Sequence, residues 1–172
     1  MAPVDLDLLI ALNSLLTVAE PLWLALGDRR AGLVFGLVLC GLLVSQRRWA
    51  AMIVLVVAVG LTDLTCARVL KPVIDRPRPC TTSLVRTPPA TEGLAPCGSG
   101  ASFPSNHAAN TAAVAVALQS PPLAVLSLVV GVSRVVLGQH YPSDVGAGWL
   151  LGAALGWITR ALAEGLGLGR AR

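Results

Sequence analysis

The stretch AAMIVLVVAVGLTDLTCARV, residues 50–69, has only two charged side chains, Asp63 and Arg68, in 20 positions. A helix needs about 20 mostly apolar residues to cross the hydrocarbon core of a bilayer. The whole chain of 172 residues has the same character, since 55% of it is hydrophobic and 13% is charged, about half the charged share of a soluble domain. The apolar residues are spread along the chain, so a cleaved signal peptide or a single anchor does not account for them. We therefore expect an all-α integral membrane protein.

Further apolar runs lie on both sides of this segment, at residues 6–26, 31–45, 103–118, 121–137 and 145–162. The first run is interrupted by polar residues and by Pro21, which is compatible with a short span or with a helix lying in the membrane interface. The prediction is a bundle of six helices, or of five plus one interfacial helix. The bundle forms a single membrane-embedded domain over residues 1–172.

The sidedness of the bundle follows from its loops. The basic turn at residues 46–49 is typical of a cytoplasmic loop. Residues 71–102 contain six prolines among polar residues, which predicts an extramembrane loop. Counting crossings places this loop, the start of the run at 103 and the polar turn at 138–144 on one face, the extracytoplasmic one. This convergence does not depend on whether the first run spans.

The first polar cluster on that face consists of Lys71, Arg76 and Arg78. Cations at a membrane boundary often only extend toward lipid headgroups. Here the neighbouring prolines fix the backbone, which favours a fixed position for the three charges instead.

The second cluster, Ser105-Asn106-His107, precedes a run of Ala and Val. Ser105 or Asn106 as N-cap would leave free backbone N–H groups and a positive helix end beside His107, an arrangement that favours an anion. An ordinary cap with a spectator histidine is the alternative.

The third cluster is Arg134, His140 and Asp144. An arginine deep in an apolar run usually faces a polar cavity or a partner. Asp144 follows His140 by four residues, so its carboxylate can orient one ring nitrogen and leave the other free to attack or to move a proton. The alternative is a plain interfacial turn.

Together the clusters predict a phosphoryl ligand, because Arg binds phosphate oxygens in bidentate fashion and Lys acts as a point charge. Phosphoryl transfer needs a nucleophile and an acid for the leaving oxygen, and two histidines can fill these roles. A two-metal mechanism needs several convergent carboxylates, whereas only Asp75, Glu92 and Asp144 lie on this face. We expect metal-independent chemistry without a cofactor.

Three stretches resemble, in order and internal spacing, the three signature motifs of the type 2 phosphatidic acid phosphatase superfamily. They are Lys71-(x6)-Arg78-Pro79, Pro104-Ser105-Asn106-His107 and Ser133-Arg134-(x5)-His140-(x3)-Asp144. The resemblance implies that His140 is the nucleophile and forms a phosphohistidine, that Asp144 supports it, and that His107 protonates the leaving oxygen. It also implies that Lys71, Arg78, Ser105 and Arg134 hold the phosphate. The family most often has Gly at the position of Asn106, whose backbone N–H can still donate to the phosphate.

The resemblance further implies a membrane lipid phosphate or diphosphate as substrate, hydrolysed in the bacterial cytoplasmic (inner) membrane at a site facing the periplasm or cell exterior. We favour undecaprenyl diphosphate because the chain is minimal and has no added domain for a large headgroup. Phosphatidylglycerophosphate, phosphatidate and lipid A 1-phosphate remain alternatives, and the oligomeric state is left open.

The four cysteines fall into two kinds. Cys40 and Cys66 lie in apolar runs and are expected to be core residues. Cys80 and Cys97 lie in the 71–102 loop, and on an extracytoplasmic face they favour a disulfide. A zinc site made of these two cysteines and the two histidines is the alternative, although the spacing matches no zinc module.

Other function classes are less well supported. The net charge of +4 comes from scattered basic residues without interleaved aromatics, which argues against nucleic-acid binding. A non-catalytic lipid-phosphate binder or transporter would be expected to have lost a histidine or the aspartate, whereas all three are present. Vanadate-dependent haloperoxidases have a similar site, but they are large soluble proteins.

Overall fold

The computed structural model describes residues 3–87, 97–98 and 100–168, and within these ranges it contains helices and no strand. The all-α prediction is confirmed. The middle of the predicted loop, residues 88–96 with Glu92, lies outside the described residues. The helices are α1 (Pro3–Asn13), η1 (Ser14–Thr17), α2 (Glu20–Gly27), α3 (Arg29–Ser45), α4 (Trp49–Leu64), η2 (Thr65–Leu70), α5 (Lys71–Ile74), η3 (Pro79–Thr81), α6 (Asn106–Ala117), α7 (Pro121–Val136) and α8 (Pro142–Gly165).

Two continuous helices are long and apolar enough to cross a membrane, Trp49–Ile74 with 26 residues and Pro142–Gly165 with 24. By length and composition, the pair Val4–Thr17 and Glu20–Gly27 counts as a third span if the two helices act as one, although the pair is bent by 115° at its break. The first apolar run is therefore neither a straight span nor a single interfacial helix. The break falls at Ala19, which is in the left-handed region with φ 61°, directly before the new helix start at Glu20 and Pro21.

Two helix boundaries differ from the prediction. The helix predicted to end at Val69 continues to Ile74 through the π-helical segment η2, so Lys71 lies on a helix and not in the loop. Pro72 lies just after the π-helical segment η2, where the regular α-helical hydrogen-bond pattern is interrupted. The last helix begins at Pro142, not at Val145, because the Asp144 carboxylate accepts from the N–H of the N-cap residue Tyr141.

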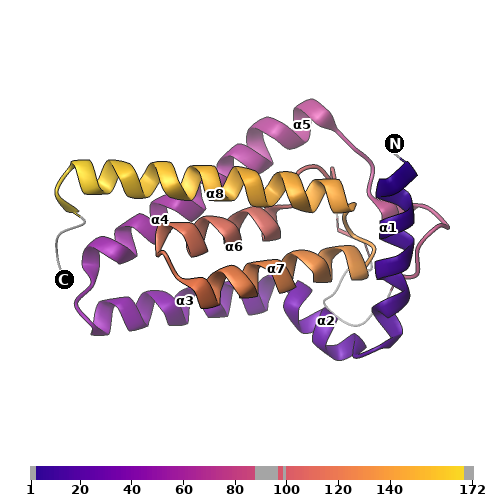
Figure 1. The fold of residues 1–172 in the computed structure, drawn as a ribbon, viewed down its shortest axis with the longest axis horizontal. Helices are drawn as coiled ribbons and strands as arrows, with labels where there is room; N and C mark the ends of the chain where they lie inside the picture. The colour runs from indigo at the N-terminus through magenta and orange to yellow at the C-terminus, as the bar shows by residue number, and fades with distance from the viewer. Residues whose placement is uncertain (1–2, 88–96, 99, 169–172) are drawn as a thin grey trace.

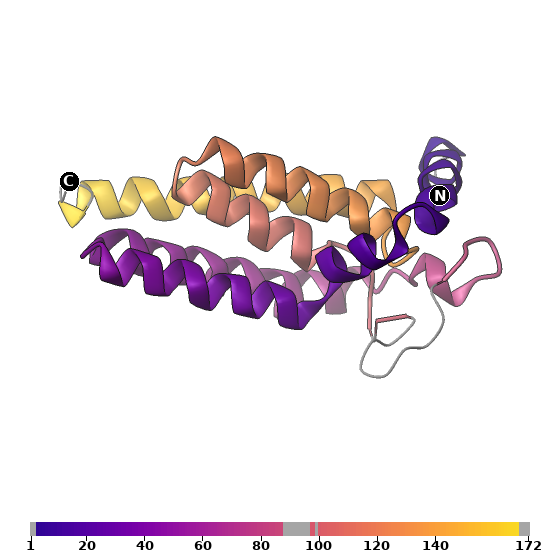
Figure 2. The same cartoon turned by 90° about the horizontal axis from the view of Figure 1, so that it is seen from below.

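The long helices form two layers. Figure 1 shows α3, α4, α6, α7 and α8 along the long axis of the molecule, with α1 crossing this direction at one end. Figure 2 shows α6, α7 and α8 in one layer and α3 and α4 in the other. With 12 residues, α6 rises about 18 Å, too little to cross a bilayer core. It is an inner helix whose buried residues are all alanines.

Small residues let α6 and α8 approach closely. Gly148, Gly152 and Gly156 recur every four residues on α8 and face the α6 backbone. A Cβ at Gly148 would lie 2.7 Å from the Ser105 carbonyl oxygen, and one at Gly156 would lie 2.5 Å from that of Ala113. Such a small-residue interface holds membrane helices together through backbone contact. It also fixes the start of α6 against the start of α8.

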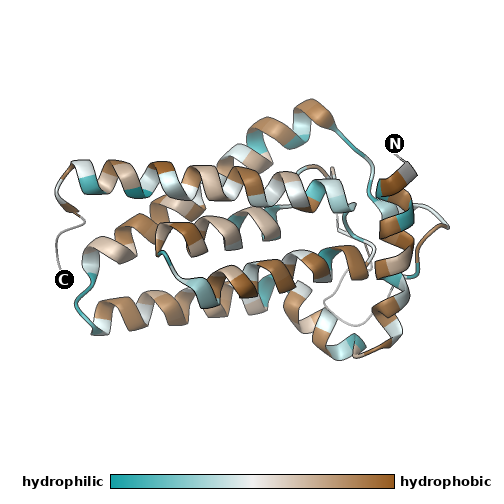
Figure 3. Cartoon of the chain, viewed as in Figure 1, coloured by the Kyte–Doolittle hydropathy of each residue, from teal (hydrophilic) through white to brown (hydrophobic). Residues whose placement is uncertain are grey.

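The outer faces of the bundle suit lipid. Large apolar side chains stay exposed there, among them Leu33, Leu37, Val56, Leu150 and Trp157, and extended exposed apolar surface is typical of a membrane or protein contact. Figure 3 shows the long helices as mainly hydrophobic. The described parts of the 71–102 loop lie at the same end as α1, opposite the C-terminal end of α8 (Figures 1 and 2).

Candidate active site

Backbone hydrogen bonds join the three predicted clusters at this end of the bundle. The N–H of Ser105, before α6, donates to the carbonyl of Asp144 in α8 at 3.0 Å. The N–H of Ser102 donates to the carbonyl of Arg76 at 2.8 Å, and the N–H groups of Gln139 and His140 donate to that of Arg134. The loop, the start of α6 and the α7–α8 turn therefore form one site.

Three cations in the site have no carboxylate partner in the described part of the chain. Lys71 Nζ donates to the Ala101 carbonyl at 2.7 Å. Arg78 donates to the carbonyls of Gly100 and Gln139, both at 3.0 Å. Arg134 donates to the Gly27 carbonyl at 2.5 Å and to the Gln139 side chain. Because carbonyls do not neutralise them, these three charges suit a multiply charged anion.

His140 lies between Arg78 and Asp144. Its Nε2 is 3.1 Å from Arg78 Nη1 and its Nδ1 is 3.6 Å from Asp144 Oδ2. A guanidinium can only donate, so Nε2 is the acceptor and the proton of the neutral ring sits on Nδ1, facing Asp144. Burial lowers the pKa of the His140 imidazole, and Arg134 and Arg78 add to this while Asp144 opposes it. The neutral ring carries its lone pair on Nε2.

Asp144 is fully buried and uses both carboxylate oxygens. Oδ1 accepts from Arg76 Nη1 at 2.6 Å, and Oδ2 accepts from the Tyr141 N–H at 2.9 Å. The bond from Tyr141 caps the start of α8. The Asp144 side chain therefore both caps α8 and lies close to the His140 ring.

The second cluster forms the start of α6. Ser105 is the N-cap and is buried, and its Oγ has no hydrogen-bond partner among the described residues. The first N–H groups of a helix have no partner within it, so the backbone at Asn106 and His107 presents donors beside Ser105. The Asn106 side chain donates to Asp63 on α4 at 2.9 Å, which leaves its backbone N–H for an anion. His107 is half-buried in the first turn of α6.

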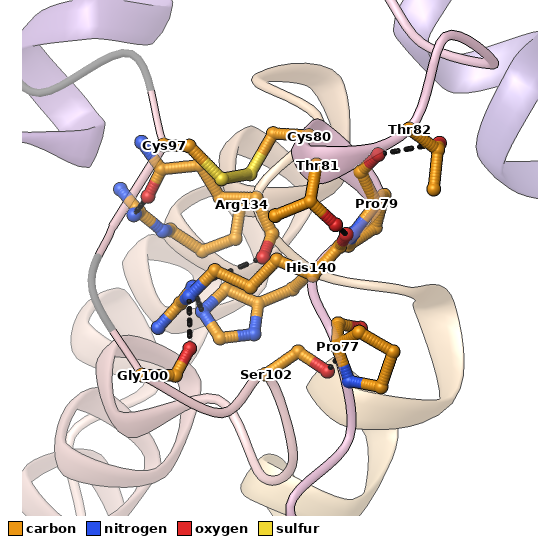
Figure 4. Close-up of a disulfide and its surroundings, with 12 residues drawn as sticks. Pro77, Pro79, Cys80, Thr81, Thr82, Cys97, Gly100, Ser102, Arg134 and His140 are labelled. Carbon is orange, nitrogen blue, oxygen red and sulfur yellow. Dashed lines mark hydrogen bonds between the residues drawn. A yellow bond between two sulfur atoms is a disulfide. The ribbon is translucent and has the colours of Figure 1, made fainter.

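The cysteines Cys80 and Cys97 form a disulfide with their Cα atoms 5.6 Å apart. Figure 4 shows its surroundings, which include Arg134 and His140. The zinc alternative is wrong for this arrangement, because both sulfurs are bonded to each other, and no other group of metal-ligating side chains gathers within residues 3–87, 97–98 and 100–168. Cys66 is buried and Cys40 is half-buried, both as free thiols.

Sequence reasoning missed several residues that build the site. Gly27 ends α2 under Arg134, and a Cβ there would lie 2.5 Å from Arg134 Nη1. Asp5 and Arg76 form a 2.7 Å ion pair beside Asp144. Nothing in the sequence pairs Asp5 with residues about 70 and 140 positions away. The glycine stripe of α8, in contrast, is visible as a spacing of four.

Fold and site together define a helical membrane-type bundle with an anion site, holding two histidines, at one end. Residues 49–166 match the PAP2 superfamily. This match covers more than half of the chain, so the chain belongs to the PAP2 superfamily, and the resemblance seen in the motifs is confirmed.

A solved structure has the same fold. The transmembrane PAP2-type phosphatidylglycerolphosphate phosphatase from Bacillus subtilis matches 100% of this chain and 82% of its own, with a TM-score of 0.62 and 24% identity. At this identity the likeness concerns the fold alone.

Curated relatives match parts of the chain. Decaprenylphosphoryl-5-phosphoribose phosphatase of Mycobacterium tuberculosis is 44% identical over 75 residues, 41% of this chain and 40% of that protein. Undecaprenyl-diphosphatase BcrC of Bacillus subtilis is 30% identical over 105 residues, which cover 58% of this chain and 51% of that protein. Lipid A 4'-phosphatase of Bacteroides thetaiotaomicron is 31% identical over 142 residues, which cover 73% of this chain and 61% of that protein. The chain thus spans about 40 to 61% of the length of these relatives.

Proposed function

We propose that this chain is a membrane lipid phosphatase that works through a phosphohistidine on His140. The observation that carries the proposal is the orientation of the His140 ring. Its Nε2 carries the lone pair and lies 3.1 Å from the guanidinium of Arg78, a cation without a carboxylate partner in the described residues, while Nδ1 faces the buried carboxylate of Asp144 at 3.6 Å. A nucleophile directed into an anion site is what phosphoryl transfer requires.

The reaction would proceed in two displacements. Nε2 of His140 attacks the terminal phosphorus and the N–P bond forms as the bond from this phosphorus to the leaving oxygen breaks. The leaving oxygen is the bridging oxygen of a lipid diphosphate or the ester oxygen of a monophosphate, and His107 gives its proton to it. His107 then takes a proton from a water molecule whose oxygen attacks the phosphohistidine. The N–P bond breaks, inorganic phosphate leaves and His140 is restored. Asp144 stabilises the positive charge that develops on the ring.

The phosphate would be held by the uncompensated cations and by the start of α6. Lys71, Arg78 and Arg134 supply charge, and the Ser105 hydroxyl and the backbone N–H of Asn106 supply neutral donors. This set can stabilise the charge on the equatorial phosphate oxygens in the transition state. We propose that no metal ion and no cofactor is needed, because these side chains take the role that metal ions play in other phosphoryl-transfer sites.

The substrate class we favour is a polyprenyl lipid carrying a phosphate or diphosphate, with undecaprenyl diphosphate first. Two of the relatives reported above have polyprenyl lipids in their names. Decaprenylphosphoryl-5-phosphoribose is a second candidate, supported by the 44% identity to a phosphatase of that name. Phosphatidylglycerophosphate, phosphatidate and lipid A phosphates are the remaining alternatives.

We propose that the whole chain is one membrane-embedded domain of six helices, with its site on the extracytoplasmic face of the bacterial inner membrane. The basic turn Gln46-Arg47-Arg48, at the end opposite the site, supports this orientation. The disulfide in the loop also supports it, since disulfides persist in oxidising compartments. The alternative function, a non-catalytic lipid-phosphate binder or transporter, is disfavoured because His107, His140 and Asp144 are all present.

A phosphate-release panel tests the proposal. The detergent-solubilised chain is assayed with undecaprenyl diphosphate, decaprenylphosphoryl-5-phosphoribose, phosphatidylglycerophosphate, phosphatidate and lipid A, with and without excess EDTA. We expect turnover in EDTA, with kcat/KM highest for a polyprenyl substrate. Absence of turnover on every lipid would overturn the phosphatase proposal, and loss of turnover in EDTA would overturn the metal-free mechanism.

A further inference from the structure

Arg76 lies two residues before Arg78 but has a different environment. Its Nη1 donates to Asp144 Oδ1 at 2.6 Å and to Ser143 Oγ at 2.7 Å, and its Nη2 donates to Asp5 Oδ2 at 2.7 Å. The guanidinium also lies 3.8 Å from the centre of the Tyr141 ring. Arg76 is thus compensated by two carboxylates, whereas Arg78, Lys71 and Arg134 contact none in the described residues. Its donors are directed at protein groups and not at the anion site.

Asp144 depends on Arg76 for its position. The Asp144 side chain is 0% exposed and that of Arg76 is 21% exposed, so the pair lies at the edge of the site with the carboxylate inside. Arg76 holds Oδ1 while the Tyr141 N–H holds Oδ2. With both oxygens fixed, the carboxylate cannot rotate about its terminal bond. The side of the carboxylate that faces His140 Nδ1 is thereby set.

Arg76 is in turn held by α1. Asp5 Oδ2 accepts from Arg76 and from Ser143 Oγ, and Asp5 Oδ1 accepts from the Ser143 N–H at 2.9 Å. One aspartate therefore connects the loop arginine to the first turn of α8.

The other end of α1 is fastened to the same part of the molecule. Asn13 Nδ2 donates to the carbonyls of Arg86 at 2.9 Å and Val136 at 2.8 Å, and the Arg86 N–H donates to Asn13 Oδ1. Leu9, between Asp5 and Asn13, is buried in a cluster with Val135 and Tyr141. Asp5, just before the first apolar run, and Asn13, within it, thus contact the loops of the proposed site. This helix precedes residues 49–166, the part that matches the family.

We propose that Arg76, anchored by Asp5 of α1, is a positioning residue for the phosphatase reaction. Arg76 fixes the Asp144 carboxylate, and Asp144 orients the His140 ring so that Nε2 points at phosphorus. This inference rests on the proposed function. It assigns to α1 a part in catalysis, because the outer anchor of the arginine comes from that helix.

The variants Arg76→Lys, Arg76→Gln and Asp5→Asn test the proposal with undecaprenyl diphosphate and detergent-solubilised protein. A lysine is a single point charge and cannot hold Asp144 and Asp5 in the fork of a guanidinium. A small misplacement of a reacting group can cost about 100-fold in rate. We expect kcat to fall about 10- to 100-fold in Arg76→Lys, further in Arg76→Gln and less in Asp5→Asn, with KM within about twofold of wild type. Arg78→Lys, in contrast, raises KM as well.

Matched controls separate this role from a general effect on folding. Asp7→Asn changes an exposed aspartate on the same helix, and Arg86→Lys changes an exposed arginine of the same loop; both should keep wild-type kcat. The cost in the double variant Asp5→Asn/Arg76→Gln should be smaller than the sum of the two single costs, because Asp5 acts partly through Arg76 and partly through Ser143. If Arg76→Gln does not fold, the double variant Asp5→Asn/Arg76→Lys is compared with Arg76→Lys instead.

The outcomes are distinct. A kcat of wild-type size in Arg76→Lys and Arg76→Gln overturns the positioning role, as does a rise in KM at unchanged kcat, which would make Arg76 a substrate ligand. Fully additive costs in the double variant overturn the link to α1. If wild type releases no phosphate from any lipid, the proposed function itself has failed.

Discussion

Replacing Gly152 by alanine tests how the fold sets the site. A Cβ at Gly152 would lie 2.7 Å from the carbonyl carbon and 2.9 Å from the Cα of Ala109, on the α6 backbone. Ordinary carbon contacts are about 3.5 to 4.0 Å, so α6 and α8 must move apart by several tenths of an ångström or more. Overpacking of this kind costs about 1–3 kcal/mol, which outweighs the gain of up to about 1 kcal/mol from the better helix propensity of alanine.

Gly146→Ala on the same helix is the matched control, because no atom lies within 4 Å of its Cβ position. There the propensity gain is unopposed. Thermal unfolding in detergent, followed by tryptophan fluorescence, should show Gly152→Ala with a Tm lower by a few degrees and Gly146→Ala with an unchanged or raised Tm. Phosphate release should fall only in Gly152→Ala, since α6 carries Ser105 and α8 carries Asp144. Equal Tm shifts of the same sign in both variants would refute the reasoning.

Two further predictions concern the disulfide and the buried histidine. Non-reducing mass spectrometry should find Cys80 and Cys97 joined, and the double Cys→Ser variant should lose roughly 3 kcal/mol of stability in the chain-entropy account; free thiols at both positions would disprove the bond. The lowered pKa of His140 means that below about pH 6.5 the unfolded chain binds a proton that the folded chain does not. As the pH is lowered below that point, the stability of the folded chain should therefore decrease, and it should decrease less steeply in His140→Asn. Parallel curves of Tm against pH for wild type and His140→Asn would contradict the assignment of this effect to His140.

The residues of the candidate site could be identified from the sequence because charge is scarce in this chain. A cation in an apolar bundle is costly unless it faces a polar cavity or a partner, so Lys71, Arg78 and Arg134 could be identified as candidate site residues without a structure. Short spacings also carried information. Asp144 follows His140 by four residues, and the structure places its Oδ2 3.6 Å from the ring.

The residues that hold this chemistry in place could not be predicted in the same way. Asp5 reaches Arg76 and Ser143 across 71 and 138 positions, and only tertiary packing determines such pairs. The first apolar run was interpreted through hydrophobicity alone, in which Asn13 counts as an interruption and not as a contact, and Asp5 lies just before the run. The extension of the helix past Lys71 to Ile74 was missed because the prolines of residues 71–102 were taken to predict a loop, whereas the structure has Pro72 on the helix, just after the π-helical segment η2.

The central claim is that His140 is the nucleophile, and the turnover of His140→Ala tests it most directly. Wild type, His140→Ala and the control Arg86→Lys are compared for phosphate release from undecaprenyl diphosphate, with Tm in detergent as the measure of folding. We predict that His140→Ala stays folded and loses at least about 10³-fold in kcat, whereas Arg86→Lys is unchanged. A folded His140→Ala variant that retains kcat within tenfold of wild type would contradict the account.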